Sequence, residues 1–387
     1  MLAAAGLDSI ARRETNHLLF LLKNPEFIKA VRVLQPRVTM QEVAQAAKVH
    51  QTTVSLALRN DPRLPEKTRR HIQAVADRLG YRPDPMLAAL NYYRSGRRPV
   101  KAPTTMAFLL NFRDREEMET SHAHRLFLEG ARKQAAQVGY QLETFYVGHN
   151  ASGAGQRVER ILKARGIGGL ILAAFGDKMI KFQMNWDNFS VVRIESQQLE
   201  GELHMVSSHQ MEVTREAVRR LHHLGYRRIG LAVGEREEVY LRNAFTAGYY
   251  VEVELHPDVM HLPPLLLPAG VSAADAAPQL ARWSKAHEIE VIASNWGGVT
   301  DALRLMGRRV PRDIVVASLD LNPDCAPNAG MRQNHRIVGE RAVEQLAILM
   351  RTNQRGLCRP HNNTLIEGDW VDGSDVPPCR TAREARG

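Results

Sequence analysis

One short stretch of the chain carries side chains suited to reading DNA bases. Gln51, Thr52 and Ser55 offer hydrogen-bond donors and acceptors, Arg59 adds a positive charge, and Leu56 is an apolar group among them. At this spacing they share the outer face of a helix, where amides and hydroxyls can contact base edges and an arginine can contact phosphates. The pattern predicts a helix that enters a major groove.

The residues around this face predict a compact three-helix head. Thr39 is a good N-cap for a first helix, and Pro65 opens a third. A tight break at Lys48 makes the first two helices cross steeply, as in a helix-turn-helix. The apolar positions expected to form the shared core are Met40, Val43, Ala44, Ala47, Val54, Ala57, Leu58, Ile72, Val75, Ala76 and Leu79.

The head resembles the N-terminal domain of the lactose-repressor and galactose-repressor (LacI-type) family, on the stretches VTMQEVAQAAKVHQTTVSLAL and LPEKTRRHIQAVADRLGYRPDP. The resemblance implies that Gln51, Thr52 and the residue at Leu56 choose the bases. Many members carry Arg where Leu56 stands, so we expect a thymine methyl contact or shape reading there, with packing against a neighbour as the alternative. His50 replaces the usual Ser cap, which leaves the helix start less well satisfied. The full set of expected DNA contacts is Thr39, Gln51, Thr52, Thr53, Ser55, Leu56, Arg59 and Leu90.

Residues 84–103 are expected to form a hinge and linker. The segment Pro85–Tyr93 is too short to hold a helix alone in water. The resemblance implies that it folds on operator DNA, with Leu90 wedged between base pairs in the minor groove. An ordinary interdomain helix is the alternative. Ser95–Pro103 is basic and turn-rich, which is typical of a domain boundary.

Positive charge is concentrated on the head. The 387 residues carry a net charge of +10, and residues 37–100 hold 12 Lys and Arg against 5 Asp and Glu, a net +7. Charge gathered on one small domain is what phosphate neutralisation requires. Three widely separated cysteines favour neither a disulfide framework nor a zinc site. With no apolar run as long as a membrane span and no signal peptide, we expect a cytoplasmic, nucleoid-associated protein.

Strand and helix patterns alternate over residues 104–375. Strands are expected at 106–111, 141–147, 169–173, 190–194, 228–233, 249–254, 290–293 and 314–319, with a Pro-rich loop over 257–268. Such repeats predict parallel sheets covered on both faces, with ligands at the carboxyl ends of the strands. Some 280 residues exceed what one sheet needs, so two lobes are expected. The fold class is therefore multidomain, an all-α helix-turn-helix head with a two-lobed α/β domain.

Three segments of this second part, HLGYRRIGLAVG, VPRDIVVASLD and MRQNHRIVGERAVEQL, resemble the regulatory domain of the same family, which is shared with periplasmic sugar-binding proteins of type I. The resemblance places effector contacts at Arg242, Asn295, Asp320 and Gln333, whose side chains can hydrogen-bond vicinal hydroxyls. Trp296 can cover an apolar sugar face. Capping of strands and loops is the alternative for the polar residues, and burial in the core for Trp296. Because Trp296 replaces a common Asp, an unusual effector, or none, also stays open.

Nothing in the sequence points to catalysis, a cofactor or a metal. Gly153 and Gly155 hint at a dinucleotide fingerprint, but Val158 occupies its third Gly position. The histidines at His122 and His124, and at His222 and His223, lack a matching set of Cys or acidic ligands.

The sequence therefore predicts a homodimeric regulator, expected to be a repressor, that binds double-stranded operator DNA and senses a small molecule, expected to be a carbohydrate or derivative. The alternatives are a solute-binding receptor and a nucleotide-dependent α/β enzyme. The predicted domains are an extension of unknown role (1–36), the head (37–83), the hinge and linker (84–103), the effector and dimerisation domain (104–375) and a tail (376–387).

Overall fold

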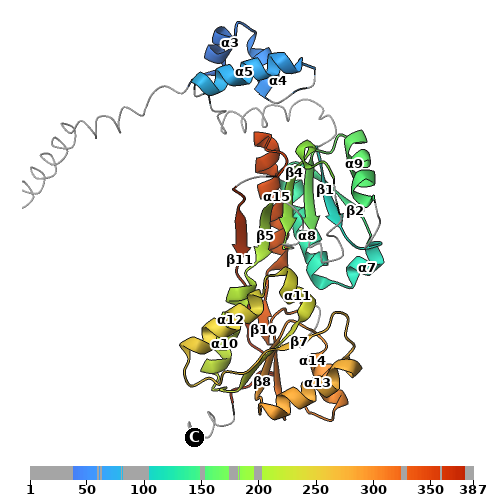
Figure 1. Ribbon diagram of the computed structural model, residues 1–387, viewed down its shortest axis with the longest axis vertical. Helices are drawn as coiled ribbons and strands as arrows, with labels where there is room; N and C mark the ends of the chain where they lie inside the picture. Colours follow the sequence, from blue (N-terminus) through green and yellow to red (C-terminus); the bar gives the residue numbers. More distant parts are fainter. Residues whose placement is uncertain are drawn as a thin grey trace, which may run out of the picture. The chain divides into compact units, whose positions relative to one another are not determined.

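The chain divides into two compact units, residues 1–101 and 102–387 (Figure 1). The computed structural model describes residues 38–58, 61, 63–79, 81, 104–148, 153–173, 182, 184–195, 203–323, 329–357 and 360–379. The predictions for the extension (1–36), for the hinge and linker up to residue 103, and for Arg59 and Leu90 lie outside these residues. Within the described part, no helix combines the length and the apolar character that a membrane crossing needs.

The first unit contains the predicted head of three helices, α3 (Met40–Ala47), α4 (Gln51–Leu58) and α5 (Glu66–Leu79). Thr39 caps α3 in a reciprocal arrangement with Glu42, in which each side chain accepts from the other residue's backbone N–H. Lys48 ends α3 in the left-handed region at φ 52°, which provides the tight turn into α4. The helices bury a small apolar core: Val43, Ala44, Ala47, Val54, Ala57, Ile72, Val75 and Ala76.

One predicted core residue of the head is wrong. Leu79, the last residue of α5, is 36% exposed, so it does not close the core. The Tyr81 N–H donates to the Ala76 carbonyl at 2.9 Å, which turns the chain back, and Tyr81 packs partly buried against the core. Gln73 ties α5 to α4 by donating to the Ala57 carbonyl at 2.9 Å.

The second unit has two lobes, as predicted, each built on a six-stranded sheet (Figure 1). In lobe A every pairing is parallel and the strand order is β11-β5-β4-β3-β1-β2. Two helices, α8 (His122–Gln137) and α15 (His335–Thr352), cover one face, and α9 (Ala154–Ala164) packs on the other. The strands are β1 (Thr105–Leu110), β2 (Gln141–Tyr146), β3 (Gly169–Ala173), β4 (Ser190–Ile194), β5 (His204–Ser208) and β11 (Asn363–Ile366).

Lobe B repeats the design in the order β12-β10-β9-β8-β6-β7, with β12 alone antiparallel. Its faces are covered by α10 and α12 on one side and by α13 and α14 on the other. The strands are β6 (Ile229–Gly234), β7 (Leu265–Leu267), β8 (Val291–Ser294), β9 (Val315–Ser318), β10 (Gly330–Arg332) and β12 (Asp369–Val371). The helices are α10 (Gln210–His223), α11 (Glu235–Tyr240), α12 (Ala244–Leu255), α13 (Ala273–Ala286) and α14 (Val299–Leu305).

The strand predicted over 249–254 is wrong, because these residues belong to helix α12. Their alternation of aromatic, β-branched and acidic residues imitates a strand. In the fold, however, Phe245, Tyr249 and Val253 recur every four residues and are all buried in the core of lobe B. The missing edge of that sheet is instead supplied by β7, which lies inside the segment predicted as a Pro-rich loop.

The polypeptide crosses between the lobes three times, and the crossings are hydrogen-bonded to one another. They lie between β5 and α10, between β10 and α15, and between β11 and β12. The Ser208 hydroxyl donates to the Gln333 carbonyl at 3.2 Å, and the Asn334 amide donates to the Glu367 carbonyl at 2.9 Å. The three crossing segments therefore form one connected junction between the lobes.

Helices α8 and α15 meet at two glycines. A Cβ atom added at Gly130 would lie 2.0 Å from the Arg336 carbonyl oxygen, and one added at Gly339 would lie 2.1 Å from the Phe127 carbonyl oxygen. Both distances are far below ordinary contact. The two backbones therefore touch directly, with no side chain between them at the crossing.

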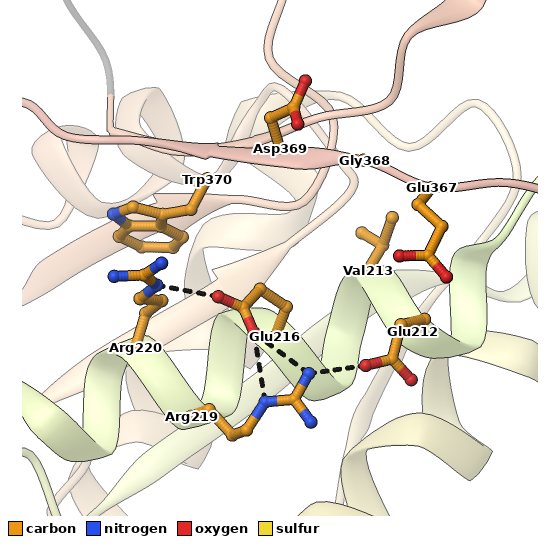
Figure 2. Close-up of a pocket in the computed structure, with 9 residues that line it drawn as sticks. All are labelled: Glu212, Val213, Glu216, Arg219, Arg220, Glu367, Gly368, Asp369 and Trp370. Atoms are coloured by element: carbon orange, nitrogen blue, oxygen red, sulfur yellow. Dashed lines mark hydrogen bonds and ion pairs between the residues drawn. The ribbon is translucent and has the colours of Figure 1, made fainter. Parts of the chain in front are cut away.

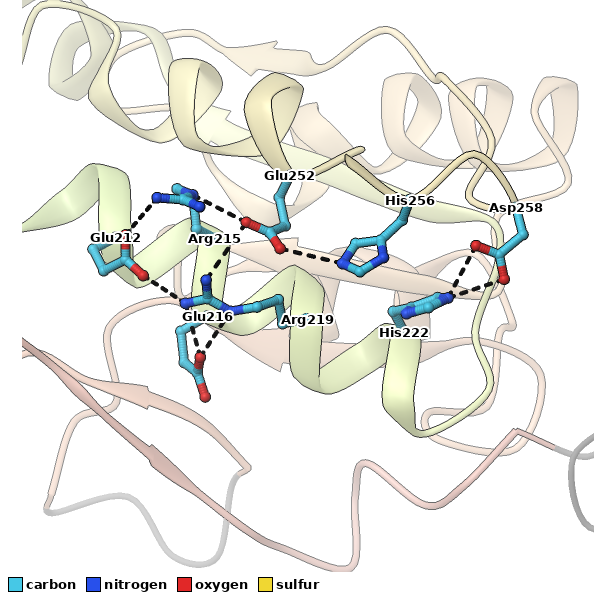
Figure 3. A network of polar contacts seen from close by, with 8 residues as sticks. All are labelled: Glu212, Arg215, Glu216, Arg219, His222, Glu252, His256 and Asp258. Atoms are coloured by element: carbon cyan, nitrogen blue, oxygen red, sulfur yellow. Dashed lines mark hydrogen bonds and ion pairs between the residues drawn. The ribbon is translucent and has the colours of Figure 1, made fainter. Parts of the chain in front are cut away.

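In lobe B, α10 and α12 are joined by a network of charged side chains (Figure 3). Glu252 is only 2% exposed and accepts from Arg215 at 3.0 Å and from His256 at 3.2 Å. Arg219 approaches the same carboxylate at 3.7 Å. A buried carboxylate is tolerated here because several cations and donors surround it.

Candidate functional site

The outer face of α4 presents the polar groups that the sequence singled out for DNA. Gln51 and Thr52 are exposed, while Thr53, Ser55 and Leu56 are half-buried. Val54 and Ala57, on the opposite face, are fully buried in the head core, so the helix has one orientation. The exposed face can offer hydrogen bonds to base edges. Partial burial of Leu56 is compatible both with a methyl contact and with packing against a neighbour.

The start of α4 is better satisfied than the sequence suggested. Nδ1 of His50 accepts from the Thr52 backbone N–H at 3.3 Å and lies 2.8 Å from the Thr52 hydroxyl. The imidazole therefore substitutes for the hydroxyl of a Ser cap. The Val54 N–H still reaches the His50 carbonyl at 3.2 Å, as in a regular first turn.

The basic residues of the head divide into structural and exposed groups. Arg69 donates to the carbonyls of Asp61 and Leu64, which fixes the loop between α4 and α5. Lys48, at the turn before α4, and Lys67, in the first turn of α5, are exposed. Exposed lysines beside a recognition helix are suited to phosphate contacts.

In the second unit, Asp320 lies where the two lobes meet. It follows β9 of lobe B, and its carboxylate is 2.8 Å from Nε2 of His335 and 3.2 Å from Nε2 of His122, both at the starts of lobe A helices. Burial opposes the charged forms, but the ion pair outweighs it, so the pKa of Asp320 is lowered and that of His335 is raised. The predicted effector residue is thus engaged in a contact between the lobes.

Three other predicted effector residues have structural partners. The Asn295 side-chain oxygen accepts from the Gly234 N–H at 3.1 Å, joining the ends of β8 and β6. Gln333 is 4% exposed and donates to the Leu319 carbonyl at 2.8 Å. Trp296 packs partly buried against the core of lobe B, and its ring fills the space beside Gly298. These positions favour the capping and core roles that the sequence left open, and effector binding by them stays a prediction.

Arg242, the remaining predicted effector residue, has a neighbour that sequence reasoning missed. Arg193 in β4 is 5% exposed, and its Nε is buried without a hydrogen-bond partner. Burial and the positive charge of Arg242 lower the pKa of Arg193. The signal in the sequence was a single arginine inside the otherwise uncharged strand Ser190–Ile194, five residues that are all buried. Arg193 of lobe A and Arg242 of lobe B are therefore near enough for one positive charge to disfavour the other.

One cavity in the second unit lies apart from these residues. It has a volume of about 310 Å³ and is lined by α10 and by residues 367–370 (Figure 2). Its charged groups on α10 are paired, because Arg219 contacts Glu212 and Glu216, and Arg220 donates to Glu216 at 2.7 Å. None of the predicted effector residues lines it. A smaller cavity of about 140 Å³ lies beside Trp296.

The fold supplies histidine partners that sequence spacing could not show. His122 meets Asp320 and His335, and His222 meets Asp258 at 3.0 Å with the ring of His256 stacked 4.3 Å away (Figure 3). Among the described residues, these two sets bring His and carboxylate atoms close enough to surround a metal ion. In both sets a histidine nitrogen and a carboxylate oxygen lie within hydrogen-bonding distance of one another.

The chain therefore combines a helix-turn-helix head with a two-lobed α/β unit. The model of the family described as bacterial regulatory proteins, lacI family, matches residues 39–84. The match covers the head, and over these residues the chain is similar to that family.

Comparison with individual proteins shows further similarity. The chain is 28% identical over 208 residues to the HTH-type transcriptional regulator PtxS of Pseudomonas plecoglossicida, an alignment that spans 56% of that relative. A transcriptional regulator CelR–cellobiose complex has a TM-score of 0.57 at 17% identity, covering 88% of this chain and 100% of that one. The lac repressor dimer bound to operator and the anti-inducer ONPF has a TM-score of 0.54 at 19% identity, covering 88% and 99%. At these identities the structural likeness defines the fold.

Proposed function

We propose that this chain is a sequence-specific regulator of transcription, a repressor that binds double-stranded operator DNA as a homodimer in the bacterial nucleoid. The observation that carries the proposal is the α4 face, with Gln51 and Thr52 exposed above a fully buried Val54 and Ala57. One such helix contacts only a few bases. Two heads related by a two-fold axis would read two half-sites, so the operator is expected to be close to a palindrome.

DNA binding is proposed to be controlled by a small molecule at the junction of the two lobes, of the carbohydrate class. An effector that prefers one arrangement of the lobes shifts the population toward that arrangement, and DNA affinity follows. The support for this is that Asp320 of lobe B lies within 3.2 Å of His122 and His335 of lobe A. In addition, the positive charge of Arg242 in lobe B acts on Arg193 in lobe A. An effector that breaks or restores those contacts binds one arrangement of the lobes more tightly than the other.

Selection of bound fragments from random duplex DNA tests the proposal. The purified full chain should enrich a near-palindromic sequence. The Gln51→Ala variant should bind that sequence more weakly by about 1 to 3 kcal/mol and lose preference at one or two base pairs. Gln45→Ala, the same substitution at an exposed site on α3, is the matched control and should keep the preference.

Two outcomes would contradict the proposal. One is a wild-type protein with no sequence preference at moderate salt. The other is a Gln51→Ala variant that loses affinity equally for every duplex, since uniform loss indicates a phosphate contact and no base reading.

A further inference from the structure

Burial of the charged Arg193 side chain destabilises the folded protein. Arg193 lies in β4 of lobe A, is 5% exposed, and keeps its Nε buried without a hydrogen-bond partner. Its strand neighbours Val191 and Ile194 are 3% and 0% exposed and apolar. A guanidinium nitrogen that is buried without an acceptor is destabilising, because no hydrogen bond replaces the one that it made to water.

The positive charge of Arg242 adds to the destabilisation caused by burial of Arg193. Arg242, from the loop after α11 of lobe B, places a second positive charge near it. Glu195, two residues farther along the chain, is instead coupled to His335 and Asp320. Among the residues that the structure describes, Arg193 therefore faces like charge and has no ion pair.

The backbone at Arg242 adds an independent observation. Arg242 and Asn243 both adopt left-handed conformations, at φ 56° and 57°. Asn tolerates this region well, whereas Arg enters it at a cost. Local strain of this kind is frequent at ligand sites. The side chain of Arg242 is exposed, so it is available.

We propose that Arg193 and Arg242 together bind the anionic group of the effector, a carboxylate or a phosphate, between the two lobes. The inference rests on the proposed function, because it names the chemical class of the molecule that would control it. Guanidinium groups pair with the oxygens of either anion through two parallel hydrogen bonds. A bound anion would neutralise both arginines and link one lobe to the other.

The first test needs no ligand. Arg193→Met replaces the guanidinium by an apolar group that can fill much of the same space, so the melting temperature of the ligand-free full chain should rise by about 2 to 4 °C. Arg282→Met, at an exposed site on α13, should leave it unchanged. A fall in melting temperature for Arg193→Met would show that the arginine makes a stabilising structural contact, and would overturn the proposal.

The second test adds anions to the same proteins. Inorganic phosphate and acetate are compared with chloride at equal ionic strength. Because phosphate stabilises most proteins by exclusion from their surface, the readout is the difference between wild type and variant. At least one anion should stabilise the wild type and Arg282→Met more than Arg193→Met, with binding about 10- to 100-fold weaker in the variant. Equal responses in all three proteins would refute the anion site.

Further ligands distinguish a carboxylate from a phosphate, and a second variant distinguishes loss of binding from a folding defect. A response to acetate and gluconate assigns a carboxylate, and a response to phosphate and glucose 6-phosphate assigns a phosphate. Arg242→Asn, which suits the left-handed backbone, should also weaken the response although its side chain is exposed. Glucose acting equally on wild type and Arg193→Met, with no anion effect, would overturn the proposal. These measurements use no DNA, so failure of the operator selection and failure of the anion site are distinguishable.

Discussion

Replacement of Gly339 by Ala should separate helices α8 and α15. The new Cβ would lie 2.1 Å from the Phe127 carbonyl oxygen and 3.0 Å from the Ala131 nitrogen, both backbone atoms. Reaching an ordinary contact of 3.4 Å requires a local shift of about 1.3 Å. Such overpacking costs about 1 to 3 kcal/mol or more, and the better helix propensity of Ala returns about 1 kcal/mol. We expect a net loss of about 2 kcal/mol, or roughly 4 to 8 °C in melting temperature.

Urea unfolding followed by tryptophan fluorescence measures this loss. All four tryptophans of the chain lie in residues 102–387, so the signal reports on the unit that contains the crossing. Gly168→Ala is the control, because a Cβ there meets nothing within 4 Å. The double variant Gly130→Ala, Gly339→Ala should cost less than the sum of the two, since one separation relieves both contacts. A Gly339→Ala protein as stable as the wild type would refute direct backbone contact at the crossing.

Two further predictions concern histidines. His50→Ala should destabilise the head by about 0.5 to 2 kcal/mol by removing the acceptor at the start of α4, and His50→Ser should restore most of it in thermal unfolding; equal losses for both would contradict the capping role. The ion pair of His335 with Asp320 should contribute fully between about pH 4 and 6.5, fading below as the lowered pKa of Asp320 is crossed and above as the raised pKa of His335 is crossed. Burial raises the pKa of Glu195, so ionisation of this carboxyl also lowers the stability of the protein as pH rises. The readout is therefore the difference in stability between the wild type and His335→Gln. The exposed residue His261 provides the control variant, His261→Gln. The difference should shrink from pH 6 to pH 9; a difference independent of pH would refute the pairing.

The head could be predicted closely from sequence because its determinants are local. The Thr39 cap, the turn at Lys48 and the apolar spacing of α3 and α4 each act within a few residues. Leu79 was the exception, since whether it is buried depends on how the chain continues to Tyr81. For the residues after the head, including Leu90, the prediction is that they fold only when operator DNA is bound.

The second unit shows where sequence reasoning stops. The alternation in residues 249–254 predicted a strand, but packing of Tyr249 and Val253 against the core decides for a helix. The short strands β10 and β12, three residues each, carry too little pattern to be found. The pairing of His122 with Asp320 spans nearly 200 positions, so no spacing rule could reveal it.

The triple passage of the polypeptide between the lobes has a practical consequence for handling the protein. Each lobe is assembled from two separate stretches of sequence, so no fragment bounded by a single cleavage contains one whole lobe and nothing of the other. A protease that nicks one exposed loop would leave the pieces held together by the shared sheets and by the bonded passages. Isolating one lobe would require rejoining its pieces with a designed linker.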